Sequence, residues 1–545
     1  MLRLTPLRGA LLFFVAVCAV YLSTVNPSLG SGDSAEFVTS AATWGIPHSP
    51  GYPLYTFLGH LCSRVLPGPL PFRVNALSAL LGAAAGAVLL LAALRAGLSG
   101  KVALAAASCL CFAPLTWRCC AIADIWALNS LFGALLILLV YGEALGEVRT
   151  FAAGLGLVLG LGAAHHLGLL LAGPAVAYYA WKRGRFRGAG RSVWGLLAGA
   201  FAVSFFLSYA LIWFRLRQNP VYVVGAVRTF AGESSFSLKL VWHELGFYFM
   251  TVQRQLTWFG LGLAAFGLLR LFLKDRERAV FLGLWIAATG PLALRLAGYP
   301  ILAEGDGVYW RGLEAPFCIL SLLAWVLALA AGLEGLFSRV RPAFAWGGAA
   351  LLAAAFLGLR WSGADQRGHD YWYGYGRDVL ASSADDGVVF LGSDDALFVM
   401  DYLRLLDGGV GDRRFIRGSP EPEAVLASPV PVYMDHSVAM GHGGRKEYAI
   451  VTAGVLARAE KDPDRNAFSR QTLEPLLNSR NRELTFFKLD ASSPEVLLAM
   501  LYSQAYRLAA LGAVHAGDDE LSFQMALRSN AMDPRELFPK YGLVR

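Results

Sequence analysis

The sequence is poor in charged residues: only 16% of its 545 residues are Asp, Glu, Lys or Arg, whereas 56% are hydrophobic. Such a composition excludes an ordinary water-soluble protein, because it cannot cover the surface that a soluble chain exposes. The seven cysteines are odd in number, and no pair has the C-x-x-C spacing of a zinc or redox site. We interpret them as small buried hydrophobic residues. The remaining class is an integral membrane protein.

The net charge of +8 does not indicate nucleic-acid binding. The Lys and Arg residues cluster in short segments between apolar runs, whereas a nucleic-acid-binding face would concentrate them on one surface. This placement is typical of the loops of a multi-span membrane protein.

A membrane span needs about 20 mostly apolar residues, and the sequence has about eleven such stretches before residue 361. The first follows Arg3 and Arg8 like a signal peptide, but no small-residue cleavage site ends it, so we expect a retained helix. The stretches start near Arg8, Arg73, Lys101, Ile125, Phe151, Leu167, Ser192, Leu256, Ala279, Leu313 and Phe344.

Charge in alternate loops predicts the topology. A cytoplasmic N-terminus places four basic loops inside, as the positive-inside rule requires. The same count places residues 26–72, the first external loop, on the outer side together with everything after Trp361. The four basic loops contain Arg95 with Lys101, Lys182 to Arg187, Lys274 to Arg278, and Arg339 with Arg341.

Residues 362–545 are more polar and predict a soluble domain that follows the membrane domain of residues 1–361. Short β-like runs at 388–391 and 431–433 predict a small α/β unit. Paired amphipathic helices at about 493–535 resemble one tetratricopeptide-type hairpin, without enough copies for a repeat array. Tyr371, Trp372, Tyr373 and Tyr375 are expected at the membrane surface, as an aromatic belt.

The first external loop contains an acidic segment, Ser31-Gly32-Asp33-Ser34-Ala35-Glu36, before a predicted short helix at 34–44. Asp33 and Glu36 have the spacing of a capping box, which needs no catalysis. A carboxylate pair near a membrane is costly, however, unless it faces a polar cavity. Residue chemistry alone leaves both interpretations open.

The membrane half of the sequence contains four motifs. Together they resemble a large membrane family that includes the eukaryotic transmembrane O-mannosyltransferase of plexin-type domains. The family usually has Glu and Tyr at the positions of Asp124 and Trp126, and Pro at the position of Ser49. The motifs are Gly32 to Glu36 with Gly45-Ile46-Pro47-His48-Ser49-Pro50-Gly51-Tyr52-Pro53, Phe112 to Trp117 with Ala123 to Asn129, Gly160 to His166, and Trp310 to Pro316.

This resemblance implies a GT-C-like fold, that of polytopic enzymes that take a sugar from a polyprenyl-phosphate donor. It implies transfer of a sugar, with mannose as one candidate, to a hydroxyl on protein or envelope glycan. Asp33, with Glu36 beside it, is the candidate general base, and a single carboxylate that takes the proton from the attacking hydroxyl predicts inversion at the anomeric carbon. The substrate-binding candidates are His48, Tyr52, Asp124, Asn129, His165, His166 and Arg311.

The leaving phosphate needs cationic or amide donors, and external arginines supply two-point contacts. Arg311 ranks first because a motif contains it. Adjacent histidines on a helix point about 100° apart, so His165 and His166 predict substrate contact and no metal. We predict no cofactor beyond the lipid-linked donor, and a divalent metal is left open. The other candidate arginines are Arg215, Arg217, Arg228 and Arg254.

We therefore predict a multi-pass protein of a bacterial inner membrane with a periplasmic C-terminal domain. Its partners are a polyprenyl-phosphate sugar, a protein or glycan acceptor and membrane lipid, without nucleic acid. A transporter or flippase is the alternative, for which inverted repeats and mid-membrane charges would be expected. A non-catalytic assembly protein whose outer domain binds partners is the third hypothesis.

Overall fold

The computed structural model describes residues 5–141, 147–218, 222–223, 238–298, 315–442, 447–461, 469–483 and 496–532. The chain forms two compact units, which are described separately. Unit 1 contains residues 1–27 and 40–368, and unit 2 contains residues 28–39 and 369–545. The first external loop is thus shared, because its segment 28–39 belongs with the C-terminal residues.

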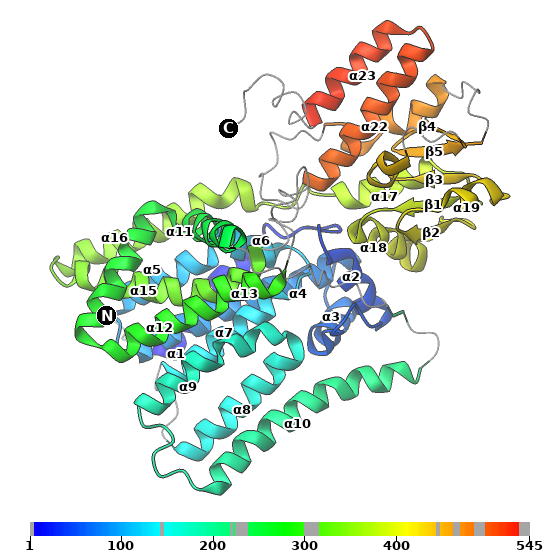
Figure 1. Cartoon of the computed structure of the whole chain (residues 1–545). Coiled ribbons are helices and arrows are strands. Elements are labelled where there is room, and N and C mark those ends of the chain that lie inside the picture. Colours follow the sequence, from blue (N-terminus) through cyan, green and yellow to red (C-terminus); the bar gives the residue numbers. More distant parts are fainter. Residues whose placement is uncertain are drawn as a thin grey trace. The chain divides into compact units, whose positions relative to one another are not determined.

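Unit 1 is helical (Figure 1), and a helix overlaps each of the predicted apolar stretches, while their number as membrane spans, about eleven, stays a prediction. Within the described residues, eight helices are long and apolar enough to cross a membrane, or nine if the bent pair α5 and α6 counts as one span; one of these lies in unit 2. The helices are α1 (Pro6–Leu22), α3 (Pro53–Val65), α4 (Leu70–Arg95), α5 (Gly100–Cys111), α6 (Pro114–Ala121), α7 (Trp126–Val140), α8 (Val148–His165), η1 (Leu167–Ala172), α9 (Gly173–Lys182), α10 (Arg191–Leu216), α11 (Leu238–Lys274), α12 (Arg276–Thr289), α13 (Pro291–Ala297), η2 (Ala315–Cys318), α15 (Ile319–Phe337) and α16 (Pro342–Ala364), while α2 (Ser34–Thr43) crosses the boundary between the units.

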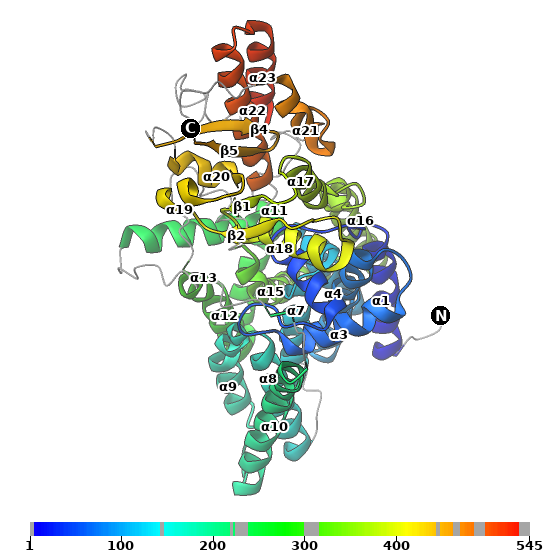
Figure 2. The same ribbon diagram turned by 90° about the vertical axis from the view of Figure 1, so that its right-hand side faces the viewer.

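Glycines let the helices of unit 1 approach closely, because they have no side chain at the contact. Such close packing stabilises helix association in a membrane, where lipid tails provide no hydrophobic driving force. α8 and α10 lie side by side in both views (Figures 1 and 2). A Cβ on Gly156 would lie 2.3 Å from the carbonyl oxygen of Leu197, and one on Gly160 would lie 2.4 Å from that of Phe201. These two glycines form a G-x-x-x-G spacing, which is typical of tightly packed membrane helices.

The four predicted cytoplasmic loops are linked by polar contacts within unit 1. A set of loops on one side of a membrane must lie at one end of the helix bundle, and these contacts meet that requirement. Their orientation toward the cytoplasm stays a prediction. The contacts are Arg183 Nη2 to Asp275 Oδ2 at 2.6 Å, Arg278 Nη1 to the carbonyl oxygen of Ala96 at 2.9 Å, and Ser99 N to Glu334 Oε2 at 3.0 Å.

Unit 2 contains a five-stranded sheet in the order β2-β1-β3-β5-β4, where β1 pairs in parallel with β2 and β3, and β5 is antiparallel to β3 and β4. α22 and α23 form a hairpin (Figures 1 and 2). The elements are α17 (Tyr371–Ala381), β1 (Val388–Leu391), α18 (Asp394–Tyr402), η3 (Leu403–Asp407), β2 (Arg414–Arg417), α19 (Pro422–Ala427), β3 (Val432–Met434), α20 (His436–Ala439), η4 (Met440–His442), β4 (Ala449–Ala453), β5 (Leu456–Glu460), η5 (Arg470–Leu473), α21 (Glu474–Leu477), η6 (Arg480–Glu483), α22 (Val496–His515) and α23 (Asp519–Met532).

The aromatic-belt prediction is wrong for two of its residues. Trp372 and Tyr375 are each only 1% exposed and lie on α17. The Tyr375 ring packs edge-on against Tyr502 of α22, with the centroids 6.1 Å apart. These aromatic side chains are core residues of unit 2, because the sheet and the helices provide an apolar interior that the local sequence does not reveal.

A buried histidine gives unit 2 a pH dependence. Burial lowers the pKa of His436 from 6.5 to about 4. Because the folded-state pKa is the lower one, the stabilisation is complete above about pH 6.5 and is lost as the pH falls toward about 4. We expect unit 2 to lose up to about 3 kcal/mol over this range.

This loss can be measured as hydrogen-exchange protection of β1 and β3 in the full chain, at about pH 7.5 and about pH 5. His436→Leu should flatten the difference between the two pH values. His515→Gln is the control, because His515 is exposed and bonds only its own helix turn within the described structure. A His436→Leu protein that keeps the full pH response would contradict the assignment.

Candidate functional site

The Pro-rich segment of the first external loop displays His48 and Tyr52 together. Gly51 has φ +89° and Tyr52 has φ +38°, so two successive residues adopt the left-handed conformation before Pro53 begins α3. A bulky residue rarely adopts this conformation, and it persists where the surroundings enforce it. The Tyr52 hydroxyl is hydrogen-bonded to His48 Nε2 at 3.2 Å. The fold therefore fixes the side chain of Tyr52, which is buried, beside that of His48.

The second acidic motif is connected to the same segment through Ser78 of α4. The Ser78 hydroxyl lies 2.8 Å from the Tyr55 hydroxyl, and it lies 3.2 Å from both the backbone N and the backbone O of Asp124. The backbone of Ala123 donates to Asn75 Oδ1 at 2.7 Å. These bonds hold the turn that carries Asp124, whose side chain is half-buried.

The two histidines at the end of α8 have different environments. His165 is fully buried, and its Nε2 lies 3.0 Å from the carbonyl oxygen of Ile125. A carbonyl only accepts, so Nε2 carries the proton and Nδ1 is an acceptor, without a partner among the described residues. The His165 ring lies 6.0 Å from that of Tyr52, between centroids. His165 thus links the turn before Trp126 to the first loop.

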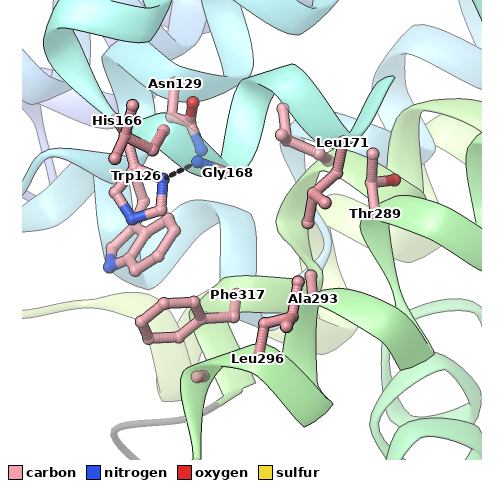
Figure 3. A pocket seen from close by; sticks show the side chains of 12 residues that line it. Trp126, Asn129, His166, Gly168, Leu171, Thr289, Ala293, Leu296 and Phe317 are labelled. Carbon is pink, nitrogen blue, oxygen red and sulfur yellow. Dashed lines mark hydrogen bonds between the residues drawn. The ribbon is translucent and has the colours of Figure 1, made fainter. Parts of the chain in front are cut away.

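His166 lies outside the helix, with an extended backbone at φ −152°. Its Nδ1 accepts a hydrogen bond from the backbone N of Gly168 at 3.1 Å, and its ring packs against Trp126 and Phe317 at centroid distances of 5.0 and 5.8 Å (Figure 3). Because Nδ1 is the acceptor, Nε2 is the atom that remains for a further polar contact.

His166 and Trp126 line a pocket of 240 Å³ in unit 1 (Figure 3). Its wall is mostly apolar and has a few polar groups, the composition expected of a small-molecule site. Besides His166, the polar groups are Asn129 of α7 and Thr289 of α12. The lining residues are Trp126, Asn129, His166, Leu167, Gly168, Leu171, Thr289, Ala293, Leu296, Ala297, Phe317 and Leu320.

Asn129, on the wall of this pocket, has a buried side-chain oxygen that is unpaired in the described structure. The residue is 1% exposed, and its Oδ1 has no hydrogen-bond partner among the described residues. An unpaired buried amide oxygen costs about 1–3 kcal/mol, so such groups occur where a ligand or water completes them.

Asp33 and Glu36 differ in their access to solvent. The backbone oxygen of Asp33 accepts from the backbone N of Phe37 at 2.9 Å, so Asp33 stands at the start of α2, and the side-chain capping box stays a prediction. Glu36 is 0% exposed, whereas the side chain of Asp33 keeps access to solvent. Proton transfer to a substrate hydroxyl requires access, so Asp33 is the better placed of the two.

Carboxylates and imidazoles are also ligand types for divalent cations, and Asp33, Glu36 and His48 are three of the residues of those types in the loop. Three candidate ligand residues do not specify a metal, and none is assigned.

The structure describes only some of the arginines that are predicted to bind the leaving phosphate. Arg311 and Arg228 lie outside the described residues. Arg215 of α10 is 8% exposed; its Nε donates to the carbonyl oxygen of Trp44 at 2.5 Å, and its guanidinium stacks on the Trp44 ring at 4.7 Å. This side chain fixes the end of α2 in unit 1, which is a structural role.

The structure also brings residues into the pocket that the motifs do not contain. Thr289, Ala293 and Leu296 come from α12 and α13, which the sequence presents only as apolar segments. Pro291, directly after Gly290, predicts a break between α12 and α13, but it does not indicate that residues on either side line a pocket. No local signal identifies these residues.

Comparisons of sequence find similarity for part of the chain. Residues 33–190 match the profile of the protein O-mannosyl-transferase TMEM260 N-terminal domain. Protein O-mannosyl-transferase TMEM260 of Mus musculus is 36% identical over 166 residues, which is 28% of this chain and 24% of that protein. Its namesake in Dictyostelium discoideum is 28% identical over 153 residues, 28% of this chain and 18% of that protein. The matched region spans less than a quarter of the length of each relative.

Comparison of structures covers most of the chain. The crystal structure of ArnT from Cupriavidus metallidurans bound to undecaprenyl phosphate has a TM-score of 0.52 and 13% identity, covering 83% of this chain and 98% of ArnT. The apo state of ArnT has a TM-score of 0.51 and 12% identity. At this identity the similarity shows the fold alone. Residues 33–190 are therefore similar to a TMEM260 N-terminal domain, and the chain has the multi-pass helical membrane fold of ArnT, the GT-C-like fold that its sequence predicts.

Proposed function

We propose that this chain transfers a sugar, with mannose as the first candidate, from a polyprenyl-phosphate donor to a hydroxyl on protein or envelope glycan. The observation that carries the proposal is the match of residues 33–190 to a protein O-mannosyl-transferase domain, which begins at Asp33 and includes the pocket residues Trp126, Asn129 and His166. The ArnT structure with undecaprenyl phosphate supports a lipid-phosphate donor for this fold.

The pocket is proposed as part of the donor site. Its apolar wall suits a polyprenyl chain, while Asn129 and His166 offer polar contacts to the sugar or the phosphate. His48 and Tyr52 are proposed to contact substrate from the first loop, and Asp124 from the second motif. His165 is proposed to act through its position, because it is fully buried.

Asp33 is proposed as the general base. Removing a proton from the acceptor hydroxyl while the phosphate leaves requires one carboxylate at the attacking oxygen. Attack from the side opposite the phosphate inverts the anomeric carbon. Glu36 is buried one helical turn away. It is proposed to contribute to the electrostatic environment of Asp33 and to stabilise the start of α2.

The proposed location follows from charge topology. The four basic loops face the cytoplasm of a bacterial inner membrane, and residues 362–545 form an extracytoplasmic domain whose last part, about 493–535, is the TPR-like hairpin. Acceptor or partner binding is the role proposed for this domain. Arg311 is kept as a candidate for the leaving phosphate, on the resemblance of its motif.

The direct test uses the full chain in nanodiscs with polyprenyl-phosphate mannose and peptides rich in Ser and Thr. We expect hexose addition to peptide, detected by mass spectrometry, with an inverted anomeric configuration. Transport of the lipid-linked sugar across a vesicle bilayer, without transfer to any peptide or glycan acceptor, would instead support the flippase alternative and contradict the proposal.

The donor pocket gives a second prediction. Ala293→Phe places a ring in the pocket, so we expect the KM for the polyprenyl-phosphate sugar to rise roughly tenfold or more. Leu292→Phe is the control, because Leu292 is the neighbouring residue of α13, is 45% exposed and does not line the pocket. Steady-state kinetics at varied donor concentration measures both. An unchanged donor KM in Ala293→Phe would remove the pocket from the donor site.

A further inference from the structure

Segment 28–39, which contains Asp33, belongs to the same compact unit as residues 369–545. One contact between them is a hydrogen bond from the backbone N of Gly32 to Asp395 Oδ2, at 2.9 Å, between residues 363 positions apart. The donor is the residue immediately before Asp33. The acceptor is a charged carboxylate, and such bonds are stronger and shorter than those between neutral groups.

The backbone around Asp33 needs such a contact. Gly30 and Gly32 stand within three residues before it, and Gly32 has φ +63°, a left-handed conformation that glycine adopts without steric cost. On the helical side, the bond from Phe37 N to the carbonyl oxygen of Asp33 holds the first turn of α2. On the loop side, Ser34 Oγ accepts from Gly30 N at 3.1 Å, and Asp395 holds Gly32. The position of Asp33 thus depends on bonds on both sides.

Asp395 stands on a rigid support. It is the second residue of α18, whose start is capped by Ser393, with Oγ accepting from Ala396 N at 3.2 Å. α18 follows β1, which is paired on both edges in the sheet. Asp395 is only 4% exposed, and a helix N-terminus favours a negative charge. A buried carboxylate on a capped helix is a fixed acceptor.

We propose that Asp395 is a positioning residue, which fixes the backbone before Asp33 and so sets the orientation of the proposed base. The inference rests on the proposed function, because it assumes that Asp33 takes the proton. It assigns to the C-terminal unit a part in catalysis that does not depend on acceptor binding. A misplacement of about 1 Å at a reacting group can lower a rate about a hundredfold.

The test compares variants of Asp395 in the full chain. Asp395→Ala removes the acceptor, so we expect kcat for sugar transfer to fall about tenfold to a hundredfold, with little change in the KM for the donor. Asp395→Asn keeps an oxygen that can accept from Gly32 N, and should restore most of the activity. Hydrogen exchange of a peptide covering residues 28–33 should accelerate in Asp395→Ala and return toward wild type in Asp395→Asn.

Asp401→Ala is the matched control, because Asp401 lies on the same helix and pairs with Arg404 on its surface. It should change neither kcat nor the exchange of residues 28–33. If Asp395→Ala does not fold, Asp395→Ser keeps a polar residue in the first turn of the helix and takes its place in the comparison.

Two results would overturn the positioning role: wild-type kcat in a folded Asp395→Ala protein, or a lowered kcat without faster exchange of residues 28–33. Full activity of Asp33→Asn is a different result. It would overturn the assignment of the base while the effect of Asp395 on exchange remained, so the two failures are distinguishable.

Discussion

Asp33→Asn is expected to lower sugar transfer about a thousandfold or more, with the fold unchanged. General-base catalysis contributes about 10²–10⁴-fold to a rate, and an amide cannot take the proton. Asparagine caps a helix about as well as aspartate, and the backbone oxygen of Asp33, which accepts from Phe37 N, is retained. The measurements are the rate of hexose addition to a peptide acceptor and the melting temperature of the protein in nanodiscs.

Two matched variants identify which carboxylate is the base. Glu36→Gln should affect stability more than Asp33→Asn, since Glu36 is fully buried. Asp124→Asn should weaken binding but leave a measurable kcat, because its backbone is held by Ser78 and its role is proposed as substrate contact. Loss of kcat in Asp124→Asn together with activity in Asp33→Asn would transfer the role of base to Asp124.

Gly267→Leu is expected to destabilise unit 1 by more than about 3 kcal/mol, the largest effect on stability that we predict. α11 and α15 touch backbone to backbone at this position: a Cβ on Gly267 would lie 1.8 Å from the carbonyl oxygen of Ala328. Gly332 has the reciprocal position on α15, where a Cβ would lie 2.3 Å from the carbonyl oxygen of Leu263. A side chain at Gly267 must separate the helices, and α15 is almost entirely buried.

The yield and melting temperature of detergent-purified protein measure this effect. Gly262→Leu is the control on the same helix, because a Cβ there would meet no atom within 4 Å. Both substitutions remove a helix glycine and add the same side chain, so their difference isolates the contact with α15. Equal melting temperatures for the two variants would show that the close approach is not required.

Hydropathy is sufficient to predict the long apolar helices of unit 1, because burial in lipid requires long apolar stretches whatever the neighbouring helices are. It does not predict the shorter helices α3 and α6. Local sequence also predicts strands β1 (Val388–Leu391) and β3 (Val432–Met434), because short runs with β-branched residues favour strands. The mistaken aromatic belt has the opposite cause. Trp372 and Tyr375 are residue types that are common both at membrane surfaces and in protein cores. Only their packing within unit 2 shows that they are core residues.

The motifs of the candidate site were also visible in the sequence, but their geometry was not. The motifs predict substrate contacts at Asn129 and His166, and both residues line one pocket. His165 was grouped with His166, although it is fully buried and bonds to Ile125. Adjacent residues at the end of a helix face different surroundings, and the surroundings come from other helices. Arg311 lies outside the described residues, so its role stays a prediction.

The sequence by itself determined that this chain is a helical membrane protein with an acidic segment after its first apolar stretch, since lipid solvation acts on local composition. The tertiary structure decided which residues share a pocket and which group holds the backbone before Asp33. The bond between Gly32 and Asp395 joins positions 363 residues apart. An amide nitrogen is present in almost every residue and a carboxylate in many, so neither side of that bond has a pattern in the sequence that could reveal its partner.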